Sequence, residues 1–320
     1  MEVLSWSYLP YVVFWFYAIK VLRHVLWHSY VYFWAPEKDL KKLAKTDWAA
    51  VTGATGGIGK GYAFELAKKG FNLILIARNP QKLEVVKQEL KEQYPEAQIE
   101  VLVFDFSTTS TEEYERILGK PLEKVGLLIN NVGRSYEIPD KLHLIAGGLP
   151  ELKNIITINL YSCFFLCKMV LKHMEKRGGG VVVNVGSSSE SLNFAYYSAY
   201  CGVKRSFGRF SDCIRIEYPN LTIQHTMPAW VATNMSKTKD LTITVRSPAE
   251  YAASAVKTIG YCNQTRGFWS HQLQFDFLQS LPLFITNPLF EFILRMKKYE
   301  NLEFIKAESE DNNNETKKIA

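Results

Sequence analysis

One strand–turn–helix–strand segment near the start of the chain restricts its fold more than any other feature. Residues 48–52 (WAAVT) have the apolar character of a buried strand, residues 60–69 have helical periodicity, and residues 72–77 (NLILIA) form a second apolar run. The turn before the helix contains three glycines, Gly53, Gly57 and Gly59. Two apolar strands joined through a helix are typical of a parallel βαβ unit. The segment therefore predicts an α/β fold.

The glycines of this turn predict a dinucleotide site. Glycine lets the backbone turn sharply and approach a pyrophosphate, whose charge the following helix N-terminus stabilises. The spacing is G-x-x-x-G-x-G rather than the more common G-x-G-x-x-G. Where NAD-binding proteins tend to carry an acidic residue after the second strand, this chain has Ala77 and Arg78. Arg78 and Lys60 are suited to a 2′-phosphate, so we expect NADP(H).

The alternation of strands and helices continues beyond this unit. Further strands are predicted at 99–105, 125–129, 181–185 and 221–227, and helices at 79–94, 112–118, 152–176 and 195–218. This order predicts a doubly wound parallel sheet of about seven strands. The carboxyl ends of parallel strands lie at one edge, where we expect Gly53, Arg78, Asp105, Asn131, Ser187 and Pro228 to gather. Asp105 would contact the adenine there.

A serine, a tyrosine and a lysine predict acid–base chemistry at the same edge. Ser187 follows the strand 181–185, and Tyr200 and Lys204 are four residues apart on the next helix, hence on one face. An ammonium group beside a phenol favours the phenolate, so we expect Lys204 to lower the pKa of Tyr200. Tyr200 would then act as a general acid or base, with Ser187 bound to the same substrate oxygen.

Taken together, these residues resemble the short-chain dehydrogenase/reductase family over about residues 48–233. The matching motifs are the TGATGGIG turn, NNVG at 130–133, an asparagine at 159, a serine thirteen residues before the tyrosine, YCGVK at 200–204 and a P-x-x-V-x-T segment at 228–233. Two departures are mild, because Val132 and Ala229 replace the more usual alanine and glycine. Tyr196 and Tyr197 lack a lysine four residues further on.

The resemblance implies a role for each matching residue. Tyr200 would be the acid/base, Lys204 would lower its pKa and hold the ribose hydroxyls, and Ser187 would polarise the substrate carbonyl. Asn159 would hold a water molecule of the proton relay, and no metal is implied. The residues implied to contact the cofactor are Gly53, Thr55, Gly57, Ile58, Gly59, Lys60, Arg78, Asp105, Asn131, Tyr200, Lys204, Pro228, Val231 and Thr233.

Within the family, the chain is most similar to the membrane-bound 17β-hydroxysteroid dehydrogenase type 12 group, the microsomal very-long-chain 3-oxoacyl-CoA reductases. The similarity includes VATNMSK at 231–237 and GFWSHQLQF at 267–275. It implies reduction of a fatty acyl-CoA in fatty-acid elongation, other elongation enzymes as partners, and a homodimer. A keto-steroid substrate is the enzymatic alternative. A non-catalytic NADP(H)-binding scaffold is a third possibility, against which the presence of Tyr200 argues.

The N-terminal part of the chain predicts membrane association. Residues 8–19 (YLPYVVFWFYAI) form an unbroken apolar and aromatic run that 25–35 nearly continues. We expect residues 1–44 to be a membrane anchor and basic linker that spans once, forms a hairpin or lies in the interface. A signal peptide or a buried helix is the alternative. Because the lysines and arginines follow the first run, the positive-inside rule places the globular part in the cytosol.

The remainder of the chain divides into three predicted parts. Residues 45–262 form the catalytic domain, and 263–300 an apolar extension that covers the substrate cleft, lies in the membrane interface or packs as a core helix. Residues 301–320 are expected to be a disordered tail. The chain ends Lys317-Lys318-Ile319-Ala320, which resembles the di-lysine signal of endoplasmic reticulum membrane proteins that is read from the cytosol.

Composition limits the remaining classes of function. The net charge of +6 fits phosphate-bearing ligands or an anionic membrane surface, and the basic residues form no single stripe that would indicate nucleic acid. The five cysteines lack the spacing of a disulfide framework or a metal site, which favours a reducing compartment.

Overall fold

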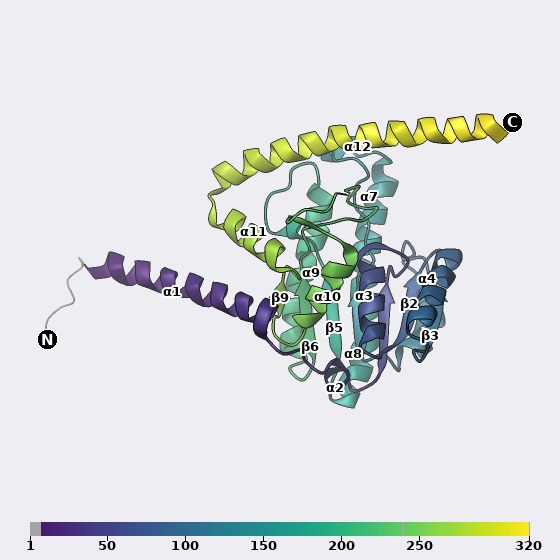
Figure 1. Ribbon diagram of the computed structural model, residues 1–320, viewed down its shortest axis with the longest axis horizontal. Helices are drawn as coiled ribbons and strands as arrows, with labels where there is room; N and C mark the ends of the chain where they lie inside the picture. Colours follow the sequence, from purple (N-terminus) through teal and green to yellow (C-terminus); the bar gives the residue numbers. More distant parts are fainter. Residues whose placement is uncertain (1–7, 239, 320) are drawn as a thin grey trace.

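The computed structural model describes residues 8–238 and 240–319, with side chains up to residue 303. Its core is a seven-stranded parallel sheet in the order β3-β2-β1-β4-β5-β6-β9 (Figure 1). The strands are β1 (Trp48–Thr52), β2 (Asn72–Ala77), β3 (Ile99–Val103), β4 (Leu127–Asn130), β5 (Val181–Val185), β6 (Thr222–Thr226) and β9 (Gln264–Thr265). The predicted doubly wound α/β fold is therefore confirmed.

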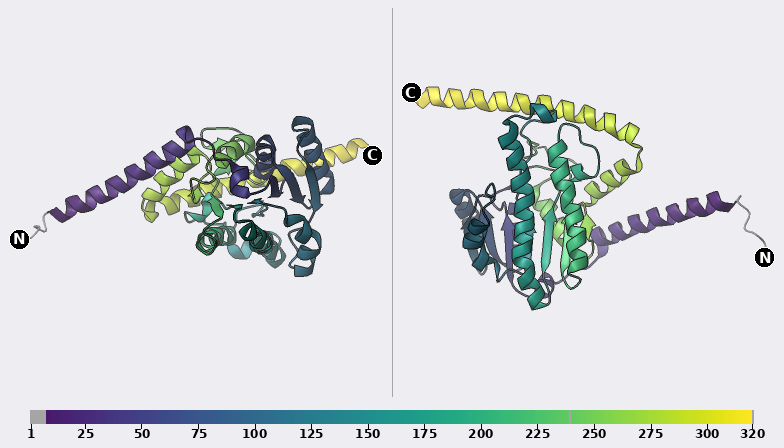
Figure 2. Two further views of the ribbon diagram at one scale, coloured as in Figure 1. Left: turned by 90° about the horizontal axis from the view of Figure 1, so that it is seen from below. Right: turned by 180° about the vertical axis from the view of Figure 1, so that it is seen from behind.

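Helices cover both faces of the sheet (Figure 2). One face is packed by α3 (Gly57–Lys68), α4 (Pro80–Gln93) and α10 (Pro248–Lys257), and the other by α8 (Ser162–Arg177), α9 (Ser198–Glu217) and the short helices α5 (Thr111–Tyr114) and α6 (Lys120–Leu122). Successive strand residues point to opposite faces, so Val51 joins the first apolar layer and Ala50 the second. Both faces are buried, which explains the continuous apolar runs of the strands.

A long helix crosses the second layer with a local change of pitch. It consists of α7 (Gly148–Ile156), the π-helical turn η5 (Thr157–Tyr161) and α8. Residues 148–177 are long and apolar enough to span a membrane, but 61% of the most apolar window is buried inside the protein, so this is a core helix. A π-helical turn inside an α-helix frequently marks a functional position, and η5 contains Asn159.

The two ends of the chain form helices outside the sheet layers. At the N-terminal end, α1 (Leu9–Ser29) continues into the π-helical turn η2 (Tyr30–Trp34), and the most apolar window of this helix is 0% buried. At the other end lie α11 (Trp269–Ser280) and α12 (Leu283–Ile319). The expectation of a disordered tail at 301–320 differs from the structure, in which α12 continues through 319. Its charged residues include good helix formers, which do not need burial to adopt a helix.

The remaining elements are small. They are α2 (Leu40–Ala44), the π-helical turn η3 (Glu115–Gly119), the 3-10 turns η4 (Leu142–Leu144) and η6 (Ser188–Glu190), and a two-stranded sheet of β7 (Trp230–Val231) and β8 (Val245–Arg246). The helix predicted from residue 195 begins at Ser198, because Tyr196 has a φ of 66° and cannot continue a right-handed helix.

Candidate active site

The glycine-rich turn between β1 and α3 forms a cradle of backbone. Gly53 has a φ of 64°, and a Cβ atom on Gly59 would lie 2.3 Å from the Gly53 carbonyl oxygen and 2.5 Å from Nδ2 of Asn131. Gly56 caps α3 without a side-chain hydrogen bond, and a Cβ there would meet nothing within 4 Å. There is thus open space beside the N-terminus of α3 at Gly56, an arrangement that fits a pyrophosphate.

The end of β4 holds this cradle in place. Asn131 donates from its backbone N to Oγ1 of Thr52 at 2.9 Å and from Nδ2 to the Thr52 carbonyl oxygen at 2.9 Å. Val132 N donates to the same Oγ1 at 2.9 Å. Asn131 therefore connects β4 to the turn after β1. It shapes the predicted cofactor site in addition to any contact that it makes with the cofactor.

The residues expected at the adenosine end lie where the strands predict, with one difference. Arg78 is exposed directly after β2, and Asp105 is exposed after β3, where its carboxylate accepts a hydrogen bond from Ser107 N at 2.9 Å. Lys60 instead pairs with Glu89 of α4. The ion pair with Glu89 leaves Lys60 less available to a phosphate than Arg78, and the contact of both residues with one phosphate stays a prediction.

Ser187, Tyr200 and Lys204 come together at the end of β5. Ser187 Oγ accepts hydrogen bonds from Ser189 N at 3.2 Å and Ser189 Oγ at 2.9 Å. Lys204 is 3% exposed, and its Nζ donates to the Val185 carbonyl oxygen at 3.0 Å and lies 5.8 Å from the ring centre of Tyr200. The helical spacing of Tyr200 and Lys204 therefore does place both on the face of α9 that meets the sheet.

The prediction that the pKa of Tyr200 is lowered is wrong for the protein without a bound cofactor or substrate. Burial of the Tyr200 hydroxyl raises the pKa of that group well above its ordinary value, and the hydrogen bond from Ser187 only partly opposes this. Burial also lowers the pKa of Lys204 to about 8. Desolvation disfavours the charged form of each group, which outweighs the attraction between ammonium and phenolate on which the prediction relied.

Asn159 lies beside Lys204 across a glycine. A Cβ on Gly133 would be 2.9 Å from Asn159 Oδ1 and 3.2 Å from Lys204 Nζ. Asn159 Nδ2 donates to the carbonyl oxygens of Arg134 at 2.8 Å and Ile155 at 2.7 Å, whereas its buried Oδ1 has no hydrogen-bond partner among the described residues. An unsatisfied buried acceptor next to an ammonium fits the predicted water-mediated relay.

The segment after β6 closes the cradle from the other side. Ser188 N donates to the Pro228 carbonyl oxygen at 2.9 Å, and Val231 is 3% exposed in β7. Thr233 accepts a hydrogen bond at its Oγ1 from Ser236 N at 3.2 Å. Its Cγ2 is 3.0 Å from the position of a Cβ on Gly57. The glycine-rich turn and the 228–233 segment, both expected to contact the cofactor, therefore meet.

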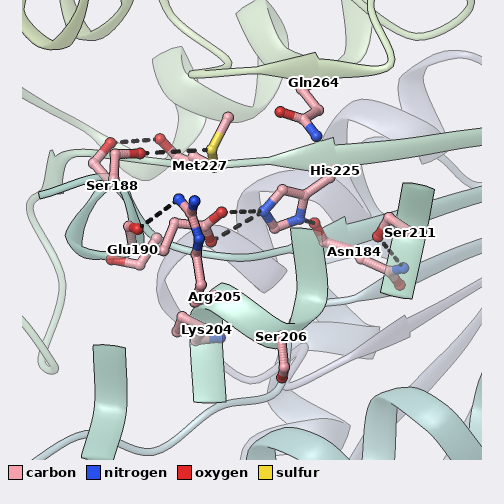
Figure 3. A network of polar contacts seen from close by, with 12 residues as sticks. Asn184, Ser188, Glu190, Lys204, Arg205, Ser206, Ser211, His225, Met227 and Gln264 are labelled. Atoms are coloured by element: carbon pink, nitrogen blue, oxygen red, sulfur yellow. Dashed lines mark hydrogen bonds and ion pairs between the residues drawn. The ribbon is translucent and has the colours of Figure 1, made fainter. Parts of the chain in front are cut away.

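A buried pair behind the serine loop was missed from the sequence. Nε2 of His225 lies 2.9 and 3.0 Å from the two carboxylate oxygens of Glu190, and its Nδ1 lies 3.1 Å from the Asn184 carbonyl oxygen (Figure 3). Nδ1 therefore faces a carbonyl oxygen, which can only accept, and Nε2 is within hydrogen-bonding distance of the Glu190 carboxylate. The signal in the sequence was the polar His225 within the otherwise buried strand 221–227.

Two further arginines brace the same loop. Arg205 donates to the Glu190 carbonyl oxygen at 3.0 Å, as Figure 3 shows. Arg266 is 3% exposed and donates to Ser188 Oγ at 3.2 Å, and Ser188 Oγ donates to the Met227 carbonyl oxygen at 2.7 Å. The loop that presents Ser187 is thus supported from β6, α9 and β9, a convergence that only the tertiary structure brings about.

The C-terminal helices cover the loop that leads to Tyr200. Leu192 and Phe194 pack with Phe275 of α11 and with Phe290 and Leu294 of α12 in one apolar cluster. Two tyrosines of the loop make further contacts. Tyr196 donates to Glu291 at 3.2 Å and accepts from Arg295 Nε at 3.0 Å, and Tyr197 stacks on Tyr136 at 5.5 Å. The apolar extension therefore packs on the loop that precedes Tyr200, and whether it covers a substrate cleft stays a prediction.

Residues 47–243 match the family described as short chain dehydrogenase. Two sequence relatives carry the name of a very-long-chain 3-oxoacyl-CoA reductase. The Caenorhabditis briggsae protein let-767 is 41% identical over 255 residues, covering 78% of this chain and 80% of that protein. The Homo sapiens protein is 33% identical over 263 residues, covering 81% and 82%. A Caenorhabditis elegans protein provisionally named a steroid dehydrogenase is 38% identical over 252 residues, covering 78% and 80%.

Solved structures share the fold. A 7β-hydroxysteroid dehydrogenase superimposes with a TM-score of 0.67 at 16% identity, covering 78% of this chain and 100% of the other. An alcohol dehydrogenase from the archaeon Thermococcus sibiricus, complexed with 5-hydroxy-NADP, gives a TM-score of 0.58 at 25% identity and covers 66% and 88%. The structure comparisons show the same fold as the family match in the sequence.

Proposed function

The chain belongs to the short-chain dehydrogenase family, and we propose that it is an NADPH-dependent ketone reductase that converts long- or very-long-chain 3-oxoacyl-CoA to 3-hydroxyacyl-CoA. As a member of the family it is a nicotinamide-dependent oxidoreductase. The observation that carries the proposal is the convergence of Ser187, Tyr200, Lys204 and Asn159 at the end of β5. The names of the sequence relatives support the thioester substrate.

The proposed residues divide the chemistry among them. The nicotinamide, when bound, supplies a hydride to the carbonyl carbon, and the substrate oxygen then needs a proton. Tyr200 donates it, and Ser187 donates a hydrogen bond to the same oxygen as negative charge develops. Lys204 holds the ribose and, with the free Oδ1 of Asn159, orders the water through which Tyr200 is reprotonated. Because burial raises the pKa of Tyr200, its hydroxyl carries a proton at neutral pH and can act as the acid in ketone reduction.

We propose NADP(H) rather than NAD(H) because Arg78, at the end of β2, has no carboxylate partner among the described residues. Arg78→Asp is expected to weaken NADPH binding by about ten- to hundredfold more than NADH binding, the range of one hydrogen-bonded ion pair. Fluorescence titration with the two nucleotides measures this. Lys60→Met is the control and should have a small effect, since Lys60 pairs with Glu89. Equal losses of both nucleotides in Arg78→Asp would contradict the assignment.

The proposed setting is the endoplasmic reticulum membrane, with the catalytic domain (45–262) in the cytosol. The apolar helix of residues 9–34, whose most apolar window contains no buried residue, supports a membrane anchor. The terminal Lys317-Lys318-Ile319-Ala320 supports the compartment, although their side chains lie outside those the structure describes. We further propose a homodimer and contacts with other enzymes of fatty-acid elongation, both from the resemblance to the family.

A keto-steroid is the second candidate substrate, because a relative of 38% identity is named among the steroid dehydrogenases. A non-catalytic NADP(H)-binding scaffold is the third possible function. Tyr200→Phe separates enzyme from scaffold, because it removes the proton donor and leaves the nucleotide cradle intact. Turnover is expected to fall by about 10²- to 10⁴-fold, with NADPH affinity unchanged in a fluorescence titration. A variant that keeps the ketone-dependent NADPH oxidation of the wild type would contradict the catalytic role of Tyr200.

A further inference from the structure

An apolar corner where α11 meets α12 has no partner among the described residues. We call Leu273, Phe277, Leu283 and Phe284 the α11–α12 corner; their side chains are 62%, 62%, 57% and 78% exposed. The residues on the opposite side of α11, including Phe275, are buried against the loop that leads to Tyr200. Four large exposed apolar side chains at one turn form a patch of the kind that marks an interaction site.

The corner lies on the side of the molecule from which α1 projects. Figure 1 and both views of Figure 2 show α1 and the α11–α12 turn extending from the same side of the domain. The two helices are joined, since His24 Nε2 of α1 lies 2.8 Å from Asp276 Oδ2 of α11. The rings of Phe33 and Trp269 also lie 6.1 Å apart. The foot of α1 and α11 are therefore in direct contact.

The contacts also set the depth of the corner relative to α1. His24 lies at the level of Asp276, which immediately precedes Phe277. On α1, the exposed apolar residues from Leu9 to Ile19 come before His24, and Lys20 and Arg23 separate them from the foot of the helix. Cations and histidines at this position are typical of the headgroup level. Phe277 therefore lies near headgroup level whenever the apolar part of α1 is in a bilayer.

We propose that the α11–α12 corner is a second membrane contact, with Phe277 and Phe284 inserted at the boundary of headgroups and acyl chains of the bilayer that holds α1. The proposal rests on the membrane anchor of the proposed function. Continuity with the exposed face of α1 identifies the occupant as a lipid surface, because both apolar surfaces face the same side and are fixed to each other. Apolar side chains at such a boundary penetrate by about 5–10 Å.

Buried apolar side chains connect the α11–α12 corner to the loop that leads to Tyr200. Phe275, Phe290 and Leu294 join the corner to Leu192 and Phe194, which lie eight and six residues before Tyr200 in the chain. An apolar substrate that leaves the bilayer at the corner thus meets apolar side chains up to the loop that precedes Tyr200. A lipid surface and the catalytic residues are then separated by one layer of helix, and the substrate's apolar chain stays out of water.

Spin-label accessibility in the full chain tests the proposal without reference to activity. One labelling cysteine at a time is introduced as Phe284→Cys, Phe277→Cys, Phe16→Cys or Val85→Cys in a Cys201→Ser/Cys213→Ser background, in which the three remaining native cysteines are buried. Each variant is labelled with a nitroxide and reconstituted into phosphatidylcholine vesicles. All four positions are exposed, so folding is preserved; Val85, 57% exposed on α4, is the matched control away from α1. Collision with oxygen reports lipid, and collision with a water-soluble nickel chelate reports the aqueous phase.

The expected result is that labels at 284 and 277 resemble the label at 16, with oxygen collisions favoured at least about threefold over the value at 85. The corner proposal is overturned, and the anchor stands, if the label at position 16 is in lipid while the labels at 284 and 277 are as accessible to the nickel chelate as the label at 85. Protection of 284 from both reagents would mean that protein covers the corner, which also overturns it. An aqueous label at 16 with 284 in lipid would instead overturn the anchor.

Discussion

Burial determines the electrostatics of the individual catalytic residues. It raises the pKa of Tyr200 and lowers that of Lys204 to about 8, so both groups are shifted toward their neutral forms. The spacing of the two residues could be predicted from the sequence, but the balance of charge attraction against desolvation could not. That balance depends on the depth to which β5 and α9 bury each side chain, which no local pattern reports.

The Glu190–His225 pair provides a stability prediction at the same scale. The two side chains are 4% and 0% exposed. His225→Leu leaves the carboxylate buried without its partner and is expected to lower the free energy of unfolding by about 3–5 kcal/mol. The double variant His225→Leu/Glu190→Leu removes the charge as well and should regain most of that loss. Thermal unfolding in detergent, followed by circular dichroism, measures both.

An exposed pair supplies the control for this cycle. Glu84 is 59% exposed and pairs with Lys87 on α4. Glu84→Gln is expected to change stability by no more than about 1 kcal/mol, as is usual for surface ion pairs. If His225→Leu costs no more than this, or if the double variant is less stable than His225→Leu, the pair does not support the loop in the way described.

At the scale of elements, the strands were the most predictable part of the fold. The bounds predicted for β1, β2 and β5 match the structure, because each strand is a short apolar run between polar residues. The helix starting at Gly57 was predicted from residue 60, since glycines conceal a helical N-terminus. Elements α10 and β9 were not predicted. The pairing of β9 with β6 joins only two residues of each strand, too few to leave a pattern in the sequence.

For the candidate site, the position of a residue on one element could be predicted, but contacts between separate elements could not. Residues carried by strand ends or by one helix face could be predicted, including Arg78, Ser187 and Tyr200. The partner of Lys60 on α4 and the Glu190–His225 contact join separate elements. Their pairing depends on how α3 packs on α4 and how β5 aligns with β6, and both are set by tertiary packing.

The close contact of the glycine-rich turn with β4 yields a prediction for the β1–α3 element. Gly59→Ala places a Cβ against backbone at 2.3 Å, which forces the turn to open. NADPH affinity is expected to fall by about ten- to hundredfold, corresponding to the usual cost of overpacking. Gly202→Ala on α9 is the control, because a Cβ there meets nothing within 4 Å. Fluorescence titration giving equal affinities for both variants would contradict the role assigned to the cradle.

At the scale of the whole molecule, a nucleotide-binding sheet, an exposed apolar helix and a C-terminal cover are fixed to one another. Helix α1 contacts α11, and α11 and α12 pack on the loop before Tyr200. The sequence predicted each part, but their mutual placement came from contacts between residues more than 200 positions apart. In the membrane setting that we propose, this arrangement would bring the reaction next to a lipid surface, where a long-chain substrate is available.

The most direct test of the central claim is NADPH oxidation by the detergent-solubilised full chain with a long-chain 3-oxoacyl-CoA and a 17-keto-steroid at equal concentration. Tyr200→Phe serves as the blank. We expect rapid NADPH oxidation with the thioester, little with the steroid and none above background in Tyr200→Phe. Faster oxidation with the steroid, or oxidation with neither while NADPH still binds, would contradict the assignment of the chain as a 3-oxoacyl-CoA reductase.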